Sequence, residues 1–222
     1  MELIIYYWDK QKMKLFTKFR NAAMLLSLAS ILPGCFPIIA GTGIYSAMVL
    51  ADRRPLSITT IDRGIQLELD GIIQNKVGSN AHVNVNVFNQ KVLLTGEVPN
   101  QTYKNLAVKE ASQQENVKKV FDELKIANTS STEDRLIDSS LYSLIKAKFV
   151  ATTDIPSNSM KIVVEAKTVY LMGVVTELEA KAAATVASRA SDSVKEVVKL
   201  TDIISEEEKK KLDSMGVVEP KK

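Results

Sequence analysis

The sequence predicts an α+β fold made of two copies of one unit, each in the order helix-strand-strand-helix-strand. The first observation is an internal repeat, in which residues 83–98 match residues 160–175 at a fixed offset of 77. Both segments alternate apolar and polar residues on either side of a short turn, as a hairpin with one buried face does. The second observation is an apolar stripe with helical spacing before each hairpin. Together they predict two domains, each a three-stranded sheet packed against two helices.

The two hairpins repeat position by position. The matched pairs are Val85 with Ile162, Val87 with Val164, Val92 with Val169, Leu94 with Leu171, Gly96 with Gly173, and Val98 with Val175. Glycine inside a strand weakens it, so Gly96 and Gly173 need a reason. We expect structural glycines, set in a bulge or where the following helix approaches the strand. A ligand contact is the alternative.

Helices are expected on both sides of each hairpin. The stripe before the first hairpin is Ile65, Leu69, Ile72, Ile73 and Val77, and an offset of 72 aligns it with Ile137, Leu141, Leu144, Ile145 and Phe149. The offset is 72 for the helices and 77 for the hairpins. The second copy should therefore have five extra residues in the loop between its first helix and its hairpin, where insertions are tolerated. After the hairpins, Asn100 and Thr176 are typical N-caps of second helices. Third strands are predicted at 117–126 and 194–203.

These elements place the first domain at residues 58–127 and the second at residues 133–204. The polar segment 128–132 joins them. Residues 35–57 are predicted to form a membrane-proximal linker before the first domain. The charged segment 205–222 is expected to be mostly disordered.

Residues 1–34 have the order of a secretory signal peptide, with Met13 as an alternative start. Basic residues precede an apolar run over 22–32, and small residues follow it. The next four residues, Leu32-Pro33-Gly34-Cys35, resemble the lipobox of bacterial lipoproteins, which implies a covalent lipid such as palmitate on Cys35. A short membrane anchor or a free thiol are the alternatives. The apolar run is shorter than the roughly 20 residues that a spanning helix needs.

Each hairpin carries the pattern Val-x-Leu-x-Gly-x-Val, and two such units resemble BON domains. Residues 169–184 are similar to the second domain of outer-membrane lipoproteins with two BON domains, of the DolP type, and residues 91–100 resemble the first. The resemblance covers Leu32 to about Ile203. It implies a lipid-anchored outer-membrane protein that faces the periplasm, supports envelope integrity and binds anionic phospholipid, such as phosphatidylglycerol or cardiolipin, through its second domain. The alternative is a structural lipoprotein whose domains bind an envelope protein.

The first helix of the second domain is the predicted lipid-binding face. It places apolar and aromatic side chains beside basic ones, which suits the headgroup region of a membrane. The expected phospholipid-binding residues are Arg135, Leu136, Tyr142, Lys146, Lys148 and Phe149. As an alternative, Leu136 and Tyr142 pack against the other domain or the linker.

Composition argues against several other functions. Residues 35–222 hold 24 Lys and Arg against 24 Asp and Glu, so they offer no electrostatic footprint for nucleic acid. His82 is the single histidine and Cys35 the single cysteine, so no imidazole or thiolate metal site is expected. We interpret His82 as a polar loop residue. The sequence predicts no catalytic activity, no metal, and no cofactor beyond the lipid on Cys35.

Overall fold

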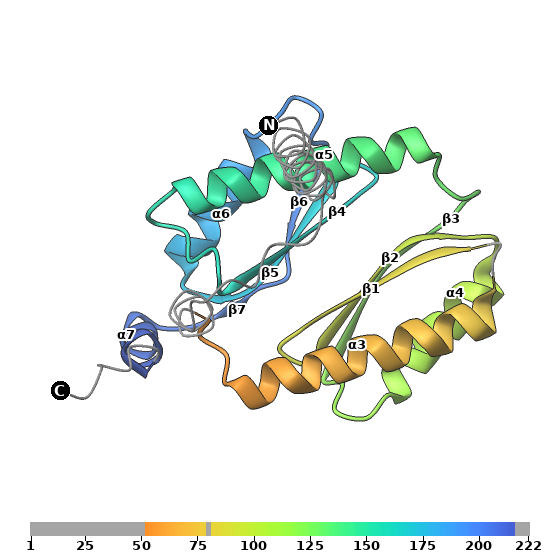
Figure 1. Ribbon diagram of the computed structural model, residues 1–222, viewed down its shortest axis with the longest axis horizontal. Coiled ribbons are helices and arrows are strands. Elements are labelled where there is room, and N and C mark those ends of the chain that lie inside the picture. The colour runs from red at the N-terminus through yellow and green to blue at the C-terminus, as the bar shows by residue number, and fades with distance from the viewer. Residues whose placement is uncertain (1–51, 79–80, 216–222) are drawn as a thin grey trace, which may run out of the picture. The chain divides into compact units, whose positions relative to one another are not determined.

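The computed structural model describes residues 52–78 and 81–215 (Figure 1). These residues lie within one compact unit, residues 43–222. The predicted two-copy α+β fold is confirmed. The first copy contains α3 (Leu56–Val77), β1 (His82–Phe88), β2 (Lys91–Val98), α4 (Gln101–Gln113) and β3 (Lys119–Ile126).

The second copy follows the same order with one difference in its last strand. Its elements are α5 (Thr132–Ala151), β4 (Met160–Glu165), β5 (Thr168–Val175), α6 (Glu177–Ser188), β6 (Glu196–Lys199) and β7 (Asp202–Ile203). The predicted third strand is therefore broken into β6 and β7, which both run parallel to β5. In each copy the hairpin is antiparallel and its second strand is the middle strand. The predicted N-caps are confirmed, since Asn100 and Thr176 each accept a hydrogen bond from the third residue beyond.

Each hairpin turn is held by a buried aspartate from the first helix of its copy. Both residues of each turn, 89–90 and 166–167, have positive φ, as a two-residue hairpin turn requires. Asp62 accepts hydrogen bonds from both backbone N–H groups of the first turn, each at 2.7 Å. Asp138 does the same in the second copy, at 2.7 and 2.9 Å. The helix and hairpin of each copy are thereby fixed in one register.

This aspartate corrects the predicted alignment of the two helices. The buried residues of α3 are Asp62, Ile65, Leu69, Ile73 and Val77, and those of α5 are Asp138, Leu141, Ile145 and Phe149. The sets match at an offset of 76, so Ile65 corresponds to Leu141 and not to Ile137. The segment between the first helix and the hairpin is therefore one residue longer in the second copy than in the first, not five. A slip of four residues is close to one helical turn, so it leaves an apolar stripe almost unchanged. Leu144, expected in the core, is 41% exposed.

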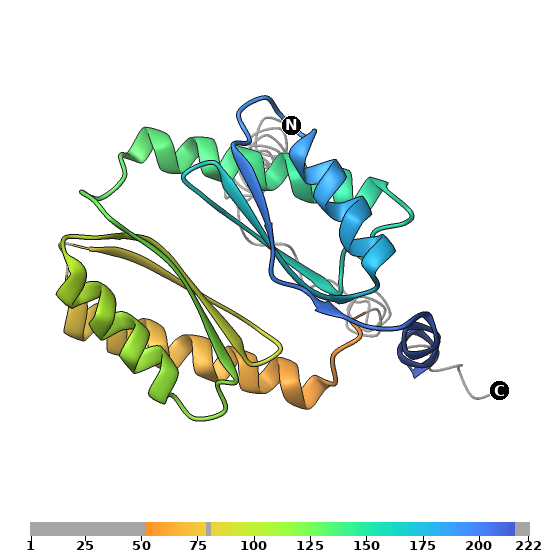
Figure 2. The same cartoon turned by 180° about the vertical axis from the view of Figure 1, so that it is seen from behind.

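Helices cover one face of each sheet, and the other faces meet each other. α3 and α4 pack on the first sheet, and α5 and α6 pack on the second, as Figure 2 shows. A third apolar cluster joins the helix-free faces; its buried members are Phe88, Leu93, Val163, Tyr170, Met172 and Val174. Polar contacts add to it, including an ion pair from Lys91 of β2 to Asp202 of β7. The two copies therefore share a core of their own.

The predicted disorder of residues 205–222 is wrong for its first part, because Glu206–Met215 forms helix α7. Its Leu212 packs against the cluster between the sheets. The buried guanidinium of Arg53 binds Asp213 of α7 and Glu179 of α6, each at 2.7 Å. Arg53 lies far away in the sequence, so charge patterns within the tail could not reveal this anchor. Residues 216–222 lie outside the described part.

The two repeated glycines are packed against the preceding strand, whereas a bulge or a close approach of the following helix was expected. Strand pairing continues through both glycines without a bulge. Gly96 has φ +108, and a Cβ placed on it would lie 2.0 Å from the carbonyl oxygen of His82. A Cβ on Gly173 would lie 3.0 Å from Met160 Cγ and from the carbonyl oxygen of Ser159. These close approaches give both glycines a packing reason, and the reason is stronger for Gly96.

Replacing Gly96 with alanine should lower the free energy of unfolding by about 2 kcal/mol or more, because backbone strain and a backbone clash act together. Urea unfolding of the 43–222 unit measures this. Gly71→Ala is the matched control, since Gly71 lies inside α3 with open space around its Cα. That change should stabilise by up to about 1 kcal/mol. Equal stability of Gly96→Ala and the wild type would contradict the packing account.

The anchor of α7 predicts loss of stability in acid. Burial disfavours the Glu179 carboxylate, but hydrogen bonds from Arg53, the Thr176 backbone and Lys209 outweigh it and lower its pKa from 4.5 to about 2. A carboxyl group with a lowered pKa stabilises the fold above its ordinary pKa, and this stabilisation fades as pH falls from about 4.5 toward 2. The melting temperature of Glu179→Gln should depend less on pH across that window. An unchanged slope would argue against this ion pair.

Candidate functional site

The outward side of α5 carries an uncharged stripe. Its members are Leu136, Ser140, Ser143, Ala147 and Val150, and all of them are exposed. Their spacings alternate between four and three residues, which keeps them on one side of a helix. Leu136 and Val150 are 63% and 66% exposed. The stripe is therefore an apolar and small-residue surface that the described residues leave uncovered.

Basic side chains flank this stripe. At 3.6 residues per turn, Arg135, Tyr142 and Lys146 lie along one side of it, and Lys148 lies along the other. Arg135 and Lys148 are exposed, and Tyr142 is 43% exposed. Lys146 is partly buried, and its Nζ donates a hydrogen bond to the carbonyl oxygen of Ser157 at 2.9 Å. An apolar stripe between cations suits a surface that offers apolar chains below and phosphates above.

The matching helix of the first copy differs at the flanks. With the offset of 76, Arg135, Lys146 and Lys148 correspond to Thr59, Asp70 and Ile72. α3 still has an exposed apolar residue, Leu67, which is 64% exposed. These three positions of α3 therefore carry no cation, although the exposed Arg63 lies one turn before Leu67. Because α5 has three basic residues beside its stripe, an anionic surface should distinguish the two copies.

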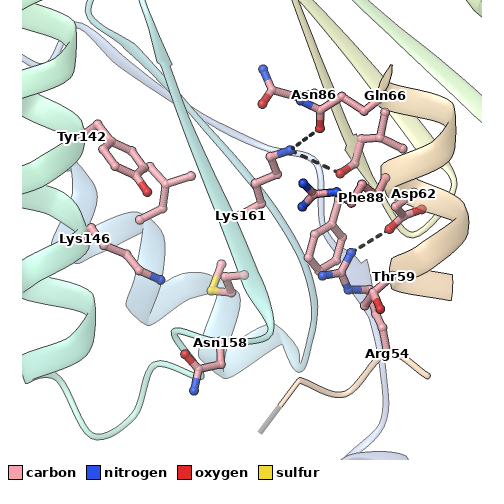
Figure 3. A pocket seen from close by; sticks show the side chains of 14 residues that line it. Arg54, Thr59, Asp62, Gln66, Asn86, Phe88, Tyr142, Lys146, Asn158 and Lys161 are labelled. Carbon is pink, nitrogen blue, oxygen red and sulfur yellow. Dashed lines mark hydrogen bonds and ion pairs between the residues drawn. The ribbon is translucent and has the colours of Figure 1, made fainter. Parts of the chain in front are cut away.

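A polar groove lies beside α5, between α3 and β1 of the first copy and β4 of the second (Figure 3). Its volume is about 590 Å³. The charged side chains that line it are Arg54, Arg63, Lys146, Lys161 and Asp62. Asp62 neutralises Arg54 through an ion pair of 2.7 Å, and the Arg54 guanidinium also lies over the Phe88 ring, 3.6 Å from its centroid. The lining keeps an excess of positive charge.

Lys161 is a partly buried cation in this lining. Burial lowers its pKa, and the positive charge of Arg54 lowers it further, against the raising effect of Asp62 and Asp70. Its Nζ contacts are long, at 3.3 Å to Gln66 Oε1 and 3.4 Å to the Val87 carbonyl oxygen (Figure 3). Within the described ranges, Lys161 has no carboxylate within 4.0 Å. A partly buried cation with no close counterion among these residues favours an anion in the groove.

The structure separates the six predicted lipid-binding residues. Leu136, Lys148 and Arg135 lie at the surface, whereas Tyr142 and Lys146 point into the groove from α5 (Figure 3). Phe149 is a correction: it is 1% exposed and belongs to the core of the second copy, because it occupies the inward side of α5. It therefore cannot contact a membrane surface.

Sequence reasoning missed Val150 and Leu144, which are both exposed on α5. The wrong helix alignment placed Leu144 in the core. Val150 follows the last predicted core residue, so its apolar side chain was an available signal.

The predicted lipid anchor, Cys35, lies outside the described residues. Within the part of the chain that the structure describes, no helix has the length and apolar character to cross a membrane.

Comparison with known proteins gives the chain a family and relatives. BON domains match residues 66–128 and again residues 137–204. The chain is 30% identical to the outer membrane lipoprotein DolP of Haemophilus influenzae, over 82% of this chain and 94% of that protein. It is also 30% identical to a 21 kDa hemolysin of Actinobacillus pleuropneumoniae, over 56% of this chain and 63% of that protein.

Among solved structures, the C-terminal domain of CdsD, a structural protein of the type III secretion system of Chlamydia trachomatis, aligns with 63% of this chain. The alignment covers 96% of that domain at 11% identity. Its TM-score of 0.28 is too low to carry an argument.

Proposed function

The chain belongs to the BON domain family as a tandem pair of the DolP type, and from this premise we propose that it is an outer-membrane lipoprotein that binds anionic phospholipid through its second domain. The observation that carries the proposal is the uncharged, exposed stripe of α5 with cations on both flanks. The matching helix of the first domain has no cation at the three corresponding positions, although Arg63 lies one turn before its exposed Leu67. The role is binding, in support of envelope integrity, and not catalysis.

The stripe meets the membrane at the level of the headgroups. Leu136 and Val150 enter the apolar boundary, while Arg135 and Lys148 meet phosphates on either side. Tyr142 and Lys146 connect this surface with the basic groove, in which no carboxylate of residues 52–78 and 81–215 pairs with Lys161. A phosphatidylglycerol or cardiolipin headgroup supplies the negative charge that these positions favour.

The lipid on Cys35 supplies the permanent anchor, and the protein faces the periplasm. One acyl chain alone attaches a protein only weakly, whereas two or more membrane signals give stable anchoring. The α5 surface then acts on a protein that is already held near the bilayer. Its role is to orient the domains and to select the lipid composition.

A second candidate is binding to an envelope protein. The exposed Leu67 on α3 supports it, because this apolar side chain has fewer basic residues beside it than the α5 stripe has. In that case the first domain binds the protein partner and the second binds lipid.

Cys35→Ala should release the protein from the membrane into the soluble fraction of the periplasm or leave its leader uncleaved. The thiol is the acceptor of the lipid, so without it no anchor forms. Fractionation and intact-mass measurement of the membrane form check this. An unmodified Cys35 in the membrane-bound protein would falsify the assignment.

Binding to phosphatidylglycerol vesicles tests the α5 surface in the 43–222 unit. Lys146→Glu combined with Lys148→Glu should weaken binding by about 30-fold or more, because each basic residue near an anionic surface contributes about 1 kcal/mol. Leu136→Glu should also weaken binding, since it places a charge in the apolar stripe. Raised salt should weaken wild-type binding.

Leu67→Glu on α3 is the matched control, because Leu67 and Leu136 are almost equally exposed, at 64% and 63%. It should leave vesicle binding unchanged. If the α5 variants keep the wild-type circular dichroism spectrum and bind undiminished, the membrane surface lies elsewhere. Loss of binding only in Leu67→Glu would assign it to the first domain.

A further inference from the structure

We propose that His82, Glu97 and Glu165 form a site for a divalent transition-metal ion, with Zn²⁺ as the best match, at the junction of the two sheets. One ligand atom from each residue lies within 4.8 Å of the other two. His82 Nδ1 is 3.2 Å from Glu97 Oε2 and 4.0 Å from Glu165 Oε1. Ligand atoms around a tetrahedral Zn²⁺ stand roughly 3.4 Å apart, so small side-chain movements suffice. The imidazole favours Zn²⁺ over Mg²⁺ or Ca²⁺.

The hairpin and the packing of the two copies bring these residues together. His82 and Glu97 are direct partners across β1 and β2, and Glu165 ends β4 in the other sheet. At the repeat offset of 77, Glu97 corresponds to Val174 and Glu165 to Phe88. Both of these are buried in the apolar cluster between the sheets. The fold therefore accepts apolar residues at these positions, and the two carboxylates need another explanation.

The charge at this site is unbalanced. Glu97 and Glu165 are each 6% exposed. Over residues 52–78 and 81–215, neither forms an ion pair with a lysine or an arginine, and His82 is their one charged neighbour within 4.0 Å when protonated. Two buried carboxylates side by side are costly without a cation.

The surrounding groups orient the carboxylates as the neighbours of metal ligands do. Asn84 Nδ2 and Thr95 Oγ1 donate to Glu165 Oε2 at 2.7 and 3.2 Å, which leaves Oε1 on the side of the His82 ring. The Ser130 backbone N–H donates to Glu97 Oε2 at 3.0 Å. These bonds fix both side chains before an ion arrives.

A hollow of about 310 Å³ opens beside His82 and Glu165. It gives the ion an entry path and leaves space for a water molecule as the fourth ligand. Arg135 also lines it, but its Nε donates to Ser130 Oγ at 3.1 Å and it forms no ion pair with either carboxylate. The bound ion would connect both copies, since two ligands come from the first and one from the second.

His82 is the only histidine in the chain, so its ring gives an unambiguous signal. The test is long-range ¹H–¹⁵N NMR of the 43–222 unit, prepared without a histidine tag and titrated with Zn²⁺ after chelator treatment. One equivalent should shift the Nδ1 resonance to a metal-bound value. The melting temperature should rise with Zn²⁺, because the ion connects the two copies.

Glu165→Gln and Glu97→Gln should each lower Zn²⁺ affinity by at least about 10-fold in calorimetry. Glu177→Gln is the control, since the Glu177 side chain is 66% exposed and lies on α6 away from the cluster. Each variant is first checked for the wild-type circular dichroism spectrum. An Nδ1 resonance that Zn²⁺ does not move in the wild type overturns the proposal, whatever the variants do. A shift that survives both glutamine variants places the ion elsewhere and also overturns it.

Discussion

Each sheet of this protein has two apolar faces, but its own helices cover only one. The helix-free faces carry Phe88 and Leu93 in the first copy and Tyr170 and Met172 in the second, and all four are buried against each other. Exposing such faces to water would cost the free energy that apolar burial provides, roughly 25 cal/mol for each Å². The contact between the sheets is therefore the constraint on which the remaining structure depends.

Several features outside the α5 stripe lie at the edge of this contact. The basic groove opens where α5 and β4 approach α3 and β1, so it exists only while the copies stay together. The cluster of His82, Glu97 and Glu165 also combines both copies. Helix α7 attaches to the same contact through Leu212 and through Arg53. The two BON domains thus form one structural unit, and these features depend on both of them.

The sequence determined the elements well because their signals are local. Alternation of apolar residues, the glycine repeat and the caps at Asn100 and Thr176 were enough to predict both hairpins and their helices. The alignment of α3 with α5 failed because an apolar stripe repeats almost every turn, and only the buried pair Asp62 and Asp138 fixes the register.

Contacts between distant residues could not be predicted in the same way. Helix α7 depends on Arg53, which is 160 positions away from Asp213. His82 was interpreted as a loop residue, yet it begins β1 and faces buried carboxylates. The sequence argument against a metal site counted histidine and cysteine only, so it left these carboxylates out. For α5, the sequence indicated an apolar helix beside lysines, but the burial of Phe149 and the exposure of Val150 required the packed helix.

The central claim is that α5, and not α3, lies against an anionic membrane. The 43–222 unit contains no cysteine, so single cysteines can be introduced at Ser143, in the α5 stripe, and at Leu67 on α3. Each is labelled with an environment-sensitive fluorophore and mixed with vesicles of phosphatidylglycerol or phosphatidylcholine. The account predicts a blue shift at position 143 with phosphatidylglycerol only, and no shift at position 67. Equal shifts at both positions, or a shift at position 67 alone, would contradict it.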